Sequence, residues 1–261
     1  MIGVFDSGLG GLTVVKELFR QLPQYDIIYF GDNARFPYGS KSREVIREFA
    51  VQDAEFLLSR GAKAIVVACN TASAQAVDAL RQKIAAPIFE VVTPAVEKAV
   101  RVTEGRVGVI GTRGTVRSGV YAEKVRAAAP GVKVFAQACP LFVPFVEEGW
   151  TARPELASIA KSYLRPLRLR NVDTLILGCT HYPFLKPVIR RAVGPGVRLV
   201  DPARETVAAI AAHLAAHPEL ETTLGRGGGH RFCVSDRTDH FETLASRWLG
   251  RPISLELVHL A

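Results

Sequence analysis

The sequence predicts an α/β fold with largely parallel sheets, built as two similar halves. Apolar, β-branched stretches recur between longer helical patterns, which is typical of parallel strands connected by helices. The segment GVFDSGLGGLTVV from residue 3 is similar in pattern to VGVIGTRGTVRSGV from residue 107. Each is followed roughly seventy residues later by a strand that ends in a cysteine, so two related halves are the simplest explanation.

The expected strands are the apolar stretches 2–5, 26–31, 64–69, 87–92, 106–111, 133–139, 174–179 and 197–201. Segment 40–60 has apolar residues at helical spacing and ends at Gly61, a C-capping residue. A second helix is expected over 71–84 and closes before Pro87. After a glycine-rich loop, segment 230–249 is expected to add a strand and a helix to either half.

Composition excludes several classes of protein. With 261 residues and 48% hydrophobic content, the chain can bury a large core. It lacks an apolar run of about 18 residues and a basic leader, so we expect a cytoplasmic protein with no membrane partner. The formal charge is +8, but basic residues alternate with acidic ones, so we expect no nucleic-acid partner. The four cysteines are widely scattered, which indicates free thiols in a reducing compartment.

Two cysteines, Cys69 and Cys179, end apolar runs in matching contexts, AIVVACNTASA and TLILGCTHYP. Open α/β sheets bind ligands at the carboxyl ends of their strands. Inverting a carbon acid needs a base on one face and an acid on the other, and a thiolate with an opposed thiol meets that need. A free thiol has a pKa of about 8.5, and a helix N-terminus can lower it. The alternative is that each is a small core residue, as we expect for Cys139 and Cys233.

The turn Asp6-Ser7-Gly8-Leu9-Gly10-Gly11 lies between a strand and a helix, so its backbone amides can bind an anion. Neither the GxGxxG spacing of a dinucleotide site nor a Walker lysine is present. The glycines could instead only permit a tight turn. Asp6 is the strongest candidate, because a carboxylate at a strand end can exchange a proton with a neighbouring thiol or ammonium, or orient it.

The loop Gly31-Asp32-Asn33-Ala34-Arg35-Phe36-Pro37-Tyr38-Gly39-Ser40-Lys41 is rich in Pro, Gly and polar residues. Such a loop can present backbone amides to a substrate carboxylate, which makes Pro37, Tyr38, Gly39 and Ser40 candidate substrate-binding residues. Capping of the next helix would by itself explain Ser40, and Tyr38 could serve packing.

Four positions in the second half are further candidates. Thr112 and Thr115 start the helix after VGVIG, where they could bind substrate or cap their own helix. One glutamate of VPFVEEGW could be a proton partner for the second thiol, although a solvated surface pair is the plainer interpretation. His181 could exchange a proton with Cys179 or simply cap a helix.

Six motifs follow one another along the chain: DSGLGGLTV, GDNARFPYGSKS, VVACNTASA, GVIGTRGTV, VPFVEEG and LGCTHYP. Over nearly its whole length the chain therefore resembles the cofactor-independent glutamate racemases of the aspartate/glutamate racemase superfamily. The resemblance implies two α/β domains facing each other across a central cleft, one of residues 1–94 with 208–261 and one of 95–207. It also implies a homodimer that interconverts L- and D-glutamate without pyridoxal phosphate or metal, supplying D-glutamate for bacterial peptidoglycan.

Carried over by position, the resemblance makes Cys69 and Cys179 the proton-transfer thiols. It implies that Asp6 assists the first, and that Glu147 and His181 assist the second. Glu147 is preferred to its neighbour Glu148 because it directly follows VPFV. Substrate contacts fall on adjacent pairs: Asp6 with Ser7, Tyr38 with Gly39, Asn70 with Thr71, and Thr180 with His181.

Two alternatives remain open. The first is a racemase of the same superfamily that acts on aspartate or another acidic amino acid. The second, from a different class, is a metal-binding protein with Cys69, Cys179, His181 and Asp6 as ligands. Closed zinc sites more often show short Cys–Cys spacings, which are absent here.

Overall fold

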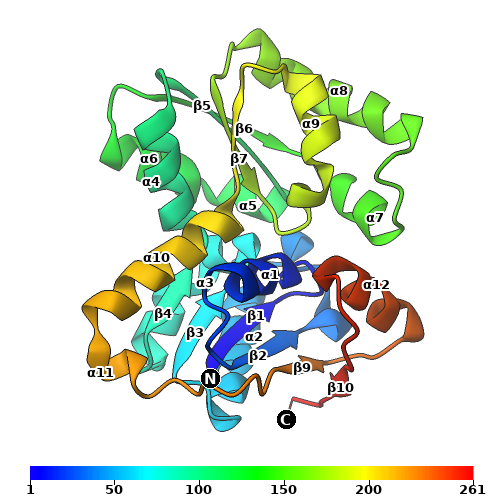
Figure 1. Cartoon of the computed structure of the whole chain (residues 1–261). Coiled ribbons are helices and arrows are strands. Elements are labelled where there is room, and N and C mark those ends of the chain that lie inside the picture. The colour runs from blue at the N-terminus through cyan, green and yellow to red at the C-terminus, as the bar shows by residue number, and fades with distance from the viewer. Residues whose placement is uncertain (261) are drawn as a thin grey trace. The chain divides into compact units, whose positions relative to one another are not determined.

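The computed structural model describes residues 1–260 and confirms the α/β class with parallel sheets. The chain divides into two compact units: the first contains Met1–Val91 with Ala203–Ala261, and the second contains Val92–Pro202. The domain limits expected from sequence stay a prediction, and their last residue, 261, lies outside the described part. Figure 1 shows the helices and strands of each unit.

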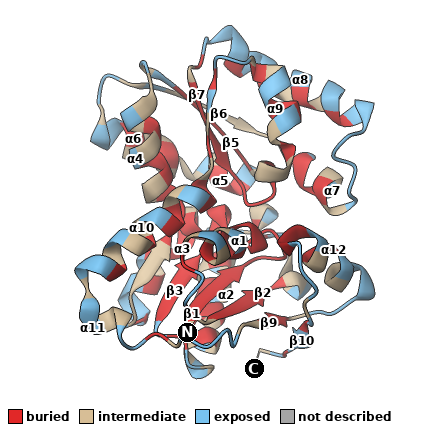
Figure 2. Ribbon diagram, viewed as in Figure 1, coloured by how far each residue is buried: buried red, intermediate tan, exposed pale blue. Residues whose placement is uncertain are grey.

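The first unit contains a six-stranded sheet with the order β10-β9-β2-β1-β3-β4, in which every pair is parallel. Its strands are β1 (Ile2–Asp6), β2 (Ile27–Gly31), β3 (Ala64–Val67), β4 (Ile88–Glu90), β9 (Arg231–Val234) and β10 (Glu256–Leu257). All residues of β1, β2 and β3 are buried (Figure 2). This explains their uninterrupted apolar sequences, since a parallel sheet is covered on both faces.

The second unit contains a four-stranded parallel sheet with the order β6-β5-β7-β8. Its strands are β5 (Arg106–Gly111), β6 (Lys133–Ala138), β7 (Thr174–Gly178) and β8 (Arg198–Val200). This order reproduces β2-β1-β3-β4 of the first sheet, strand for strand. The sequence similarity between the segments at residues 3 and 107 therefore corresponds to equivalent first strands, β1 and β5, at the same place in two sheets.

Helices connect the strands within each unit. Those of the first unit are α1 (Leu12–Gln21), α2 (Arg43–Ser59), α3 (Asn70–Lys83), α11 (Pro218–Glu221), α12 (Asp239–Leu249) and α10 (Pro202–Ala216), whose first residue is the last of the second unit. Those of the second unit are α4 (Val92–Val102), α5 (Arg113–Ser118), α6 (Val120–Ala128), α7 (Phe142–Glu147), α8 (Pro154–Leu169) and α9 (Lys186–Val193). Short 3₁₀ helices are η1 (Asn33–Arg35), η2 (Tyr38–Ser40) and η3 (Tyr182–Leu185).

Alternation along the strands of the first sheet determines its packing against the helices. Phe5, Ile28, Phe30, Ile65 and Val67 belong to one buried cluster that also contains the apolar residues of α2 and α3. Because successive strand residues point to opposite faces, these five share one face of the sheet. The cluster continues to Cys69, so the packing of α3 onto the sheet also fixes the backbone that carries this thiol.

One helix start differs from the sequence-based expectation. Helix α2 is capped by Ser42, whose Oγ accepts a hydrogen bond from Val45 N at 3.4 Å. Ser40 lies in η2, and its Oγ donates to Pro37 O at 3.3 Å. Ser40 is wrong as the cap because the intervening 3₁₀ turn moves the start of the helix two residues further along the chain.

The C-terminal segment belongs to the first sheet, where β9 pairs with β2 and β10 pairs with β9.

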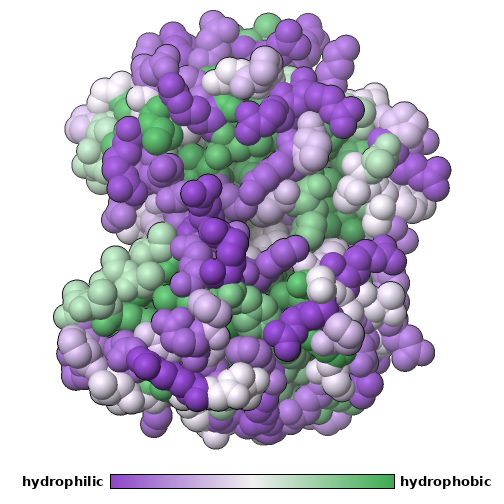
Figure 3. Space-filling model, in the orientation of Figure 1, coloured by the Kyte–Doolittle hydropathy of each residue, from purple (hydrophilic) through white to green (hydrophobic). Residues whose placement is uncertain are grey.

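In the described part of the chain, no helix is long and apolar enough to cross a membrane. Figure 3 shows hydrophilic residues over much of the visible face and a run of weakly hydrophobic residues along α10, whose sequence is rich in alanine. The strongly apolar residues lie mainly in the two cores.

Candidate active site

Both candidate thiols lie just after the ends of strands that occupy equivalent places in their sheets. Cys69 comes two residues after the end of β3, and Cys179 comes directly after β7. Strand β3 pairs with β1, and β7 pairs with β5, in the same parallel sense. In each sheet the order of the strands reverses at this pair: the second strand lies on one side of the first, and the third lies on the other. Ligands of open α/β sheets bind at such a switch point.

Cys69 caps helix α3, and its Sγ accepts a hydrogen bond from Ala72 N at 3.5 Å. The same sulfur lies 3.6 Å from Ser7 Oγ. Burial, followed by the charge of Asp6, raises the pKa of the Cys69 thiol to about 12, although the hydrogen bonds from Ala72 and Ser7 act in the opposite direction. The hydrogen bond from the N-terminus of α3 lowers this pKa as expected, but burial and the carboxylate outweigh it, so the net change is upward and not into the range near neutral pH. Cys69 therefore carries its proton at neutral pH.

Asp6 is held at the end of β1 by a tightly packed turn. The carboxylate is fully buried, and its Oδ2 accepts a hydrogen bond from Gly8 N at 3.1 Å. Tyr29 OH donates to Gly8 O at 2.5 Å, which fixes the turn from the neighbouring strand. A Cβ on Gly11 would lie 2.6 Å from Asp6 Cβ. Glycine is required at this position because Asp6 occupies the space of a side chain.

In the second unit, Cys179, His181 and Glu147 form a chain of polar contacts. Cys179 Sγ lies 3.9 Å from His181 Nδ1, and His181 Nε2 lies 3.1 Å from Glu147 Oε1 at the end of α7. Burial opposes the charge of His181, but hydrogen bonds and charge interactions with Cys179 and Glu147 prevail and raise its pKa to about 10. These contacts favour the protonated imidazole, in which both nitrogens donate.

The surroundings of the two thiols differ more than their sequences predict. No α-helix begins at Cys179: His181 precedes the 3₁₀ helix η3, which contains Pro183, and α9 begins only at Lys186. Thr180 Oγ1 lies 3.5 Å from His181 Nδ1. A charged imidazole thus stands next to Cys179, where a helix N-terminus stands next to Cys69.

The remaining candidates line the same strand ends. Asn70 and Thr71 form the buried first turn of α3. Thr112 caps α5 and accepts a hydrogen bond from Thr115 N at 3.1 Å, and the two hydroxyls lie 3.1 Å apart. Capping therefore accounts for Thr112, whose hydroxyl is also adjacent to the end of β5. Glu148, the alternative to Glu147, is exposed at the end of α7.

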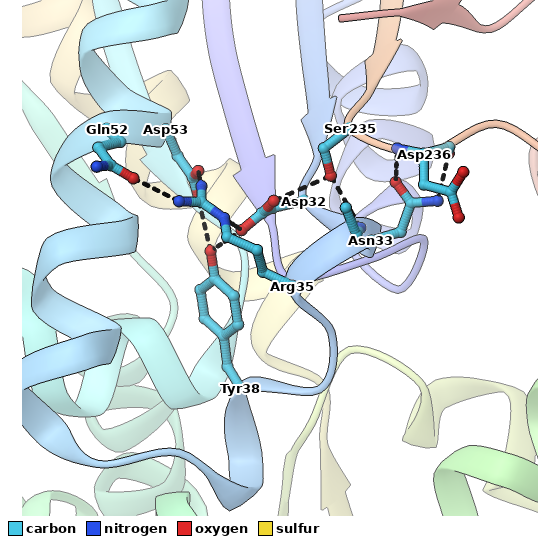
Figure 4. A network of polar contacts seen from close by, with 9 residues as sticks. Asp32, Asn33, Arg35, Tyr38, Gln52, Asp53, Ser235 and Asp236 are labelled. Carbon is cyan, nitrogen blue, oxygen red and sulfur yellow. Dashed lines mark hydrogen bonds and ion pairs between the residues drawn. The ribbon is translucent and has the colours of Figure 1, made fainter. Parts of the chain in front are cut away.

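The loop from Asp32 to Ser40 contains a polar network that sequence reasoning missed (Figure 4). Tyr38 is buried, and its hydroxyl contacts the carboxylates of Asp32 and Asp53. Arg35 bridges the same two carboxylates. A signal was present: Asp53 lies at a position where the helical spacing of α2 calls for an apolar residue. Pro37 and Ser40 are exposed on this loop, and Gly39 is half-buried.

Three further observations limit the chemistry. Within residues 1–260, no group of three or more His, Cys, Asp or Glu side chains could hold a metal ion. Cys139 and Cys233 are free and buried. Burial raises the pKa of the Cys139 thiol, and the carbonyl of Cys139 accepts a hydrogen bond from Tyr182 OH at 2.8 Å. Cys139 therefore supports the turn that follows Cys179.

Comparison with known proteins places these features in a family. The family model described as Asp/Glu/Hydantoin racemase matches residues 2–210. A glutamate racemase of Geobacter metallireducens is 50% identical over 250 residues, which are 95% of this chain and 92% of that protein.

Solved structures agree with the sequence comparison. Glutamate racemase isoform RacE1 from Bacillus anthracis has a TM-score of 0.93 at 40% identity, with 100% of this chain and 97% of that chain covered. A glutamate racemase from Francisella tularensis in complex with D-glutamate has a TM-score of 0.91 at 40% identity, covering 99% and 97%. The chain therefore belongs to the Asp/Glu/hydantoin racemase family, among its glutamate racemases.

Proposed function

We propose that this chain interconverts L- and D-glutamate by proton transfer between two cysteines, Cys69 and Cys179, without metal or pyridoxal phosphate. One observation carries the proposal: two buried thiols follow equivalent strands of two similar sheets, and each has its own acid–base partner. The relatives of this chain at 40–50% identity are glutamate racemases. Glutamate is therefore the proposed substrate.

The reaction needs one thiolate and one thiol. The thiolate removes the α-proton: the C–H bond breaks, an S–H bond forms, and the electron pair is delocalised into the substrate carboxylate. The second thiol then gives its proton to the opposite face of the planar carbon, and its own sulfur is left as thiolate. The mechanism therefore requires both sulfurs to reach the same α-carbon.

The groups next to each sulfur suit these steps differently. Asp6 is the base to which the Cys69 thiol can pass its proton, and the hydrogen bonds from Ser7 and Ala72 stabilise the resulting thiolate. Next to Cys179, the protonated His181 can donate a hydrogen bond to the sulfur when it is charged, and Glu147 keeps the imidazole oriented. Asp6, His181 and Glu147 are thus proton partners, and the sulfurs contact the reacting carbon.

Substrate binding is assigned to polar groups at the ends of the strands. The backbone N–H groups of the loop around Tyr38 and Gly39, and those of the first turn of α3, are proposed to donate to the α-carboxylate. The side-chain oxygens of Asn70 and Thr71 are proposed to accept hydrogen bonds from the ammonium group. The further contacts that the family resemblance implies are Asp6, Ser7, Thr180 and His181. We add Pro37 and Ser40 from the loop, and Thr112 and Thr115 from the helix start after β5.

Racemisation in deuterated water tests the reaction. L-glutamate incubated with the purified protein should lose its circular dichroism signal while deuterium appears at the α-carbon, and D-glutamate should do the same. Aspartate is tested in parallel, because greater turnover of aspartate would assign the chain to the alternative substrate. An unchanged signal with both amino acids would overturn the proposed activity.

Single substitutions test the two-thiol mechanism. Cys69→Ser and Cys179→Ser should each abolish racemisation in both directions. A serine hydroxyl is far too weak an acid to ionise and act as the base in place of the thiolate. Cys233→Ser is the matched control, because Cys233 is a free, buried thiol in β9 that the proposed chemistry does not use, and the variant should leave activity near normal. Near-normal turnover of both enantiomers by Cys69→Ser or Cys179→Ser would contradict the mechanism.

We further propose that the product D-glutamate serves peptidoglycan synthesis in the cytoplasm and that the protein is a homodimer. A bacterial strain that requires D-glutamate for growth should grow without it when it expresses this chain, and the Cys69→Ser variant should not support growth. Sedimentation of the purified protein measures the oligomeric state, and a monomer at working concentrations would contradict the dimer.

A further inference from the structure

The network in Figure 4 ties the loop between β2 and α2 to the body of the first unit. Asp53 is fully buried in the middle of α2. A carboxylate in such a place is costly unless it is paired and hydrogen-bonded. Its Oδ1 lies 2.8 Å from Arg35 Nη2, and its Oδ2 accepts a hydrogen bond from Tyr38 OH at 2.9 Å. Both partners belong to the loop, so Asp53 holds two points of the loop from the helix.

The guanidinium of Arg35 contacts Asp32, Asp53 and Gln52 through three different nitrogens. Its Nε lies 2.6 Å from Asp32 Oδ2, and its Nη1 donates to Gln52 Oε1. The guanidinium carbon lies 4.1 Å from the centre of the Phe49 ring. Five donors in a fixed plane and a favourable stacking face make this position specific for arginine rather than lysine.

The other side of the loop is fastened to the end of β9. Ser235 Oγ donates to Asp32 Oδ1 at 3.0 Å and accepts a hydrogen bond from Ala34 N at 2.9 Å. Asn33 Oδ1 accepts from Asp236 N at 3.1 Å. The loop is therefore held by α2 on one side and by the residues after β9 on the other. Within the loop, the buried Tyr38 is fixed through its hydroxyl.

We propose that Asp53 and Arg35 are positioning residues for substrate binding: through Tyr38 they hold the backbone amides of Tyr38 and Gly39 in place for the substrate carboxylate. The inference rests on the proposed function, which assigns these amides to glutamate. Neither side chain is proposed to touch the substrate. The loop is held by a buried carboxylate, that of Asp53, and by the guanidinium of Arg35. An ordinary surface loop packs without such a pair of buried ionic contacts.

Steady-state kinetics in both directions test the inference. The amides bind the α-carboxylate of the bound substrate, and they bind it more strongly in the transition state, when the electron pair of the broken C–H bond is delocalised into it. Their displacement should therefore raise KM and also lower kcat. Asp53→Ala should raise KM for both enantiomers by about tenfold. This is the effect of losing one charge-assisted hydrogen bond between a loop amide and the substrate carboxylate. Asp53→Asn keeps an oxygen that accepts from Arg35 and replaces Oδ2 by an NH2 group, which can donate to the Tyr38 hydroxyl while that hydroxyl donates to Asp32. This variant should restore most of the affinity.

Asp26→Ala is the matched control. Asp26 precedes β2, whereas Asp32 follows it, and the carboxylate of Asp26 accepts hydrogen bonds from Gly227 N and Gly229 N at 2.9 and 3.0 Å. Its loss removes comparable hydrogen bonds from the same unit but none from the substrate loop. The KM of Asp26→Ala should therefore equal that of the wild type.

Arg35→Ala provides a second measurement, which does not depend on a variant with an altered buried helix. A cavity of about 370 Å³ borders Arg35, Asp32 and Gln52, so added guanidinium ion can reach the vacated position. The raised KM of Arg35→Ala should fall again as guanidinium is added at concentrations far below those that unfold proteins. Methylammonium, a cation without the planar fork, should not restore it.

The outcomes separate the two proposals. Racemisation by the wild type reports on the proposed function, and its absence would overturn that function and this inference together. With an active wild type, an unchanged KM in Asp53→Ala and Arg35→Ala would overturn the inference alone. A fall in kcat at constant KM would also overturn it, since it would place these residues in the chemical step rather than in positioning.

Discussion

The pKa of His181 gives the most direct test of the second half of the site. Glu147→Gln removes the carboxylate charge 3.1 Å from His181 Nε2 and keeps an oxygen acceptor. Glu147 supplies one of the two hydrogen bonds and one of the two charge interactions that raise the pKa of His181 from 6.5 to about 10. The substitution should therefore lower this pKa by about one to two units, or about 1.4–2.7 kcal/mol.

The effect on stability has a defined sign. A histidine whose pKa is higher in the folded protein contributes stability below its unfolded pKa of 6.5, and this contribution is lost as pH rises through about 10. For the wild type, the full rise corresponds to at most about 5 kcal/mol. The loss of unfolding free energy in Glu147→Gln should have its full size below about pH 8, decrease as pH rises further, and disappear above pH ~10.

Heteronuclear NMR of protein with labelled histidine measures the pKa directly, and His181→Gln assigns the signal among the six histidines. Glu148→Gln is the control, because this neighbouring glutamate is exposed at the end of α7. The alkaline limit of racemase activity should move down with the pKa of His181 in Glu147→Gln. A wild-type His181 that titrates between about pH 6 and 7, or equal effects of the two glutamate substitutions, would refute the reasoning.

Two further substitutions test local structure. Ser42→Ala removes the N-cap of α2 and should lower the free energy of unfolding by about 1 kcal/mol, measured by urea denaturation; Ser40→Ala should have little effect, and equal losses would contradict the assignment of the cap. Gly11→Ala places a Cβ 2.6 Å from Asp6 Cβ and should reduce racemase turnover by displacing the carboxylate, whereas Gly131→Ala, with no atom within 4 Å of the added Cβ, should not. Normal turnover of Gly11→Ala would show that the position of Asp6 is not critical.

The fold was predictable because its elements carry strong local signals. The buried strands are uninterrupted apolar runs, and equivalent runs in the two halves end in Cys69 and Cys179. Strand β10 gave no such signal, since its two residues are exposed and it is held by pairing with β9 and by an ion pair between Glu256 and Arg60. Its existence depends on contacts with residues far away in the sequence, which no local pattern reports.

The site was predictable where one short motif contains the interacting groups. Cys179 and His181 are two residues apart, and their contact follows from the motif GCTHYP. The network of Asp32, Arg35 and Asp53 was not predicted, because Asp53 lies 18 residues after Arg35 in a helix whose apolar spacing dominates its appearance. A charged residue on the buried face of that helix was the sign that a partner must exist.

The two thiols occupy equivalent places, yet their electrostatic surroundings are opposite. Burial and the carboxylate of Asp6 favour the protonated form of Cys69, whereas Cys179 stands beside a cationic imidazole. A reaction that interconverts mirror images does not need a symmetric site, because only the ratio of kcat/KM in the two directions is fixed by the equilibrium. In the proposed mechanism, turnover in one direction leaves the proton on the opposite sulfur from turnover in the other. We therefore assign to the unequal partners, Asp6 on one side and His181 with Glu147 on the other, the role of returning each sulfur to the protonation state in which the next substrate can react.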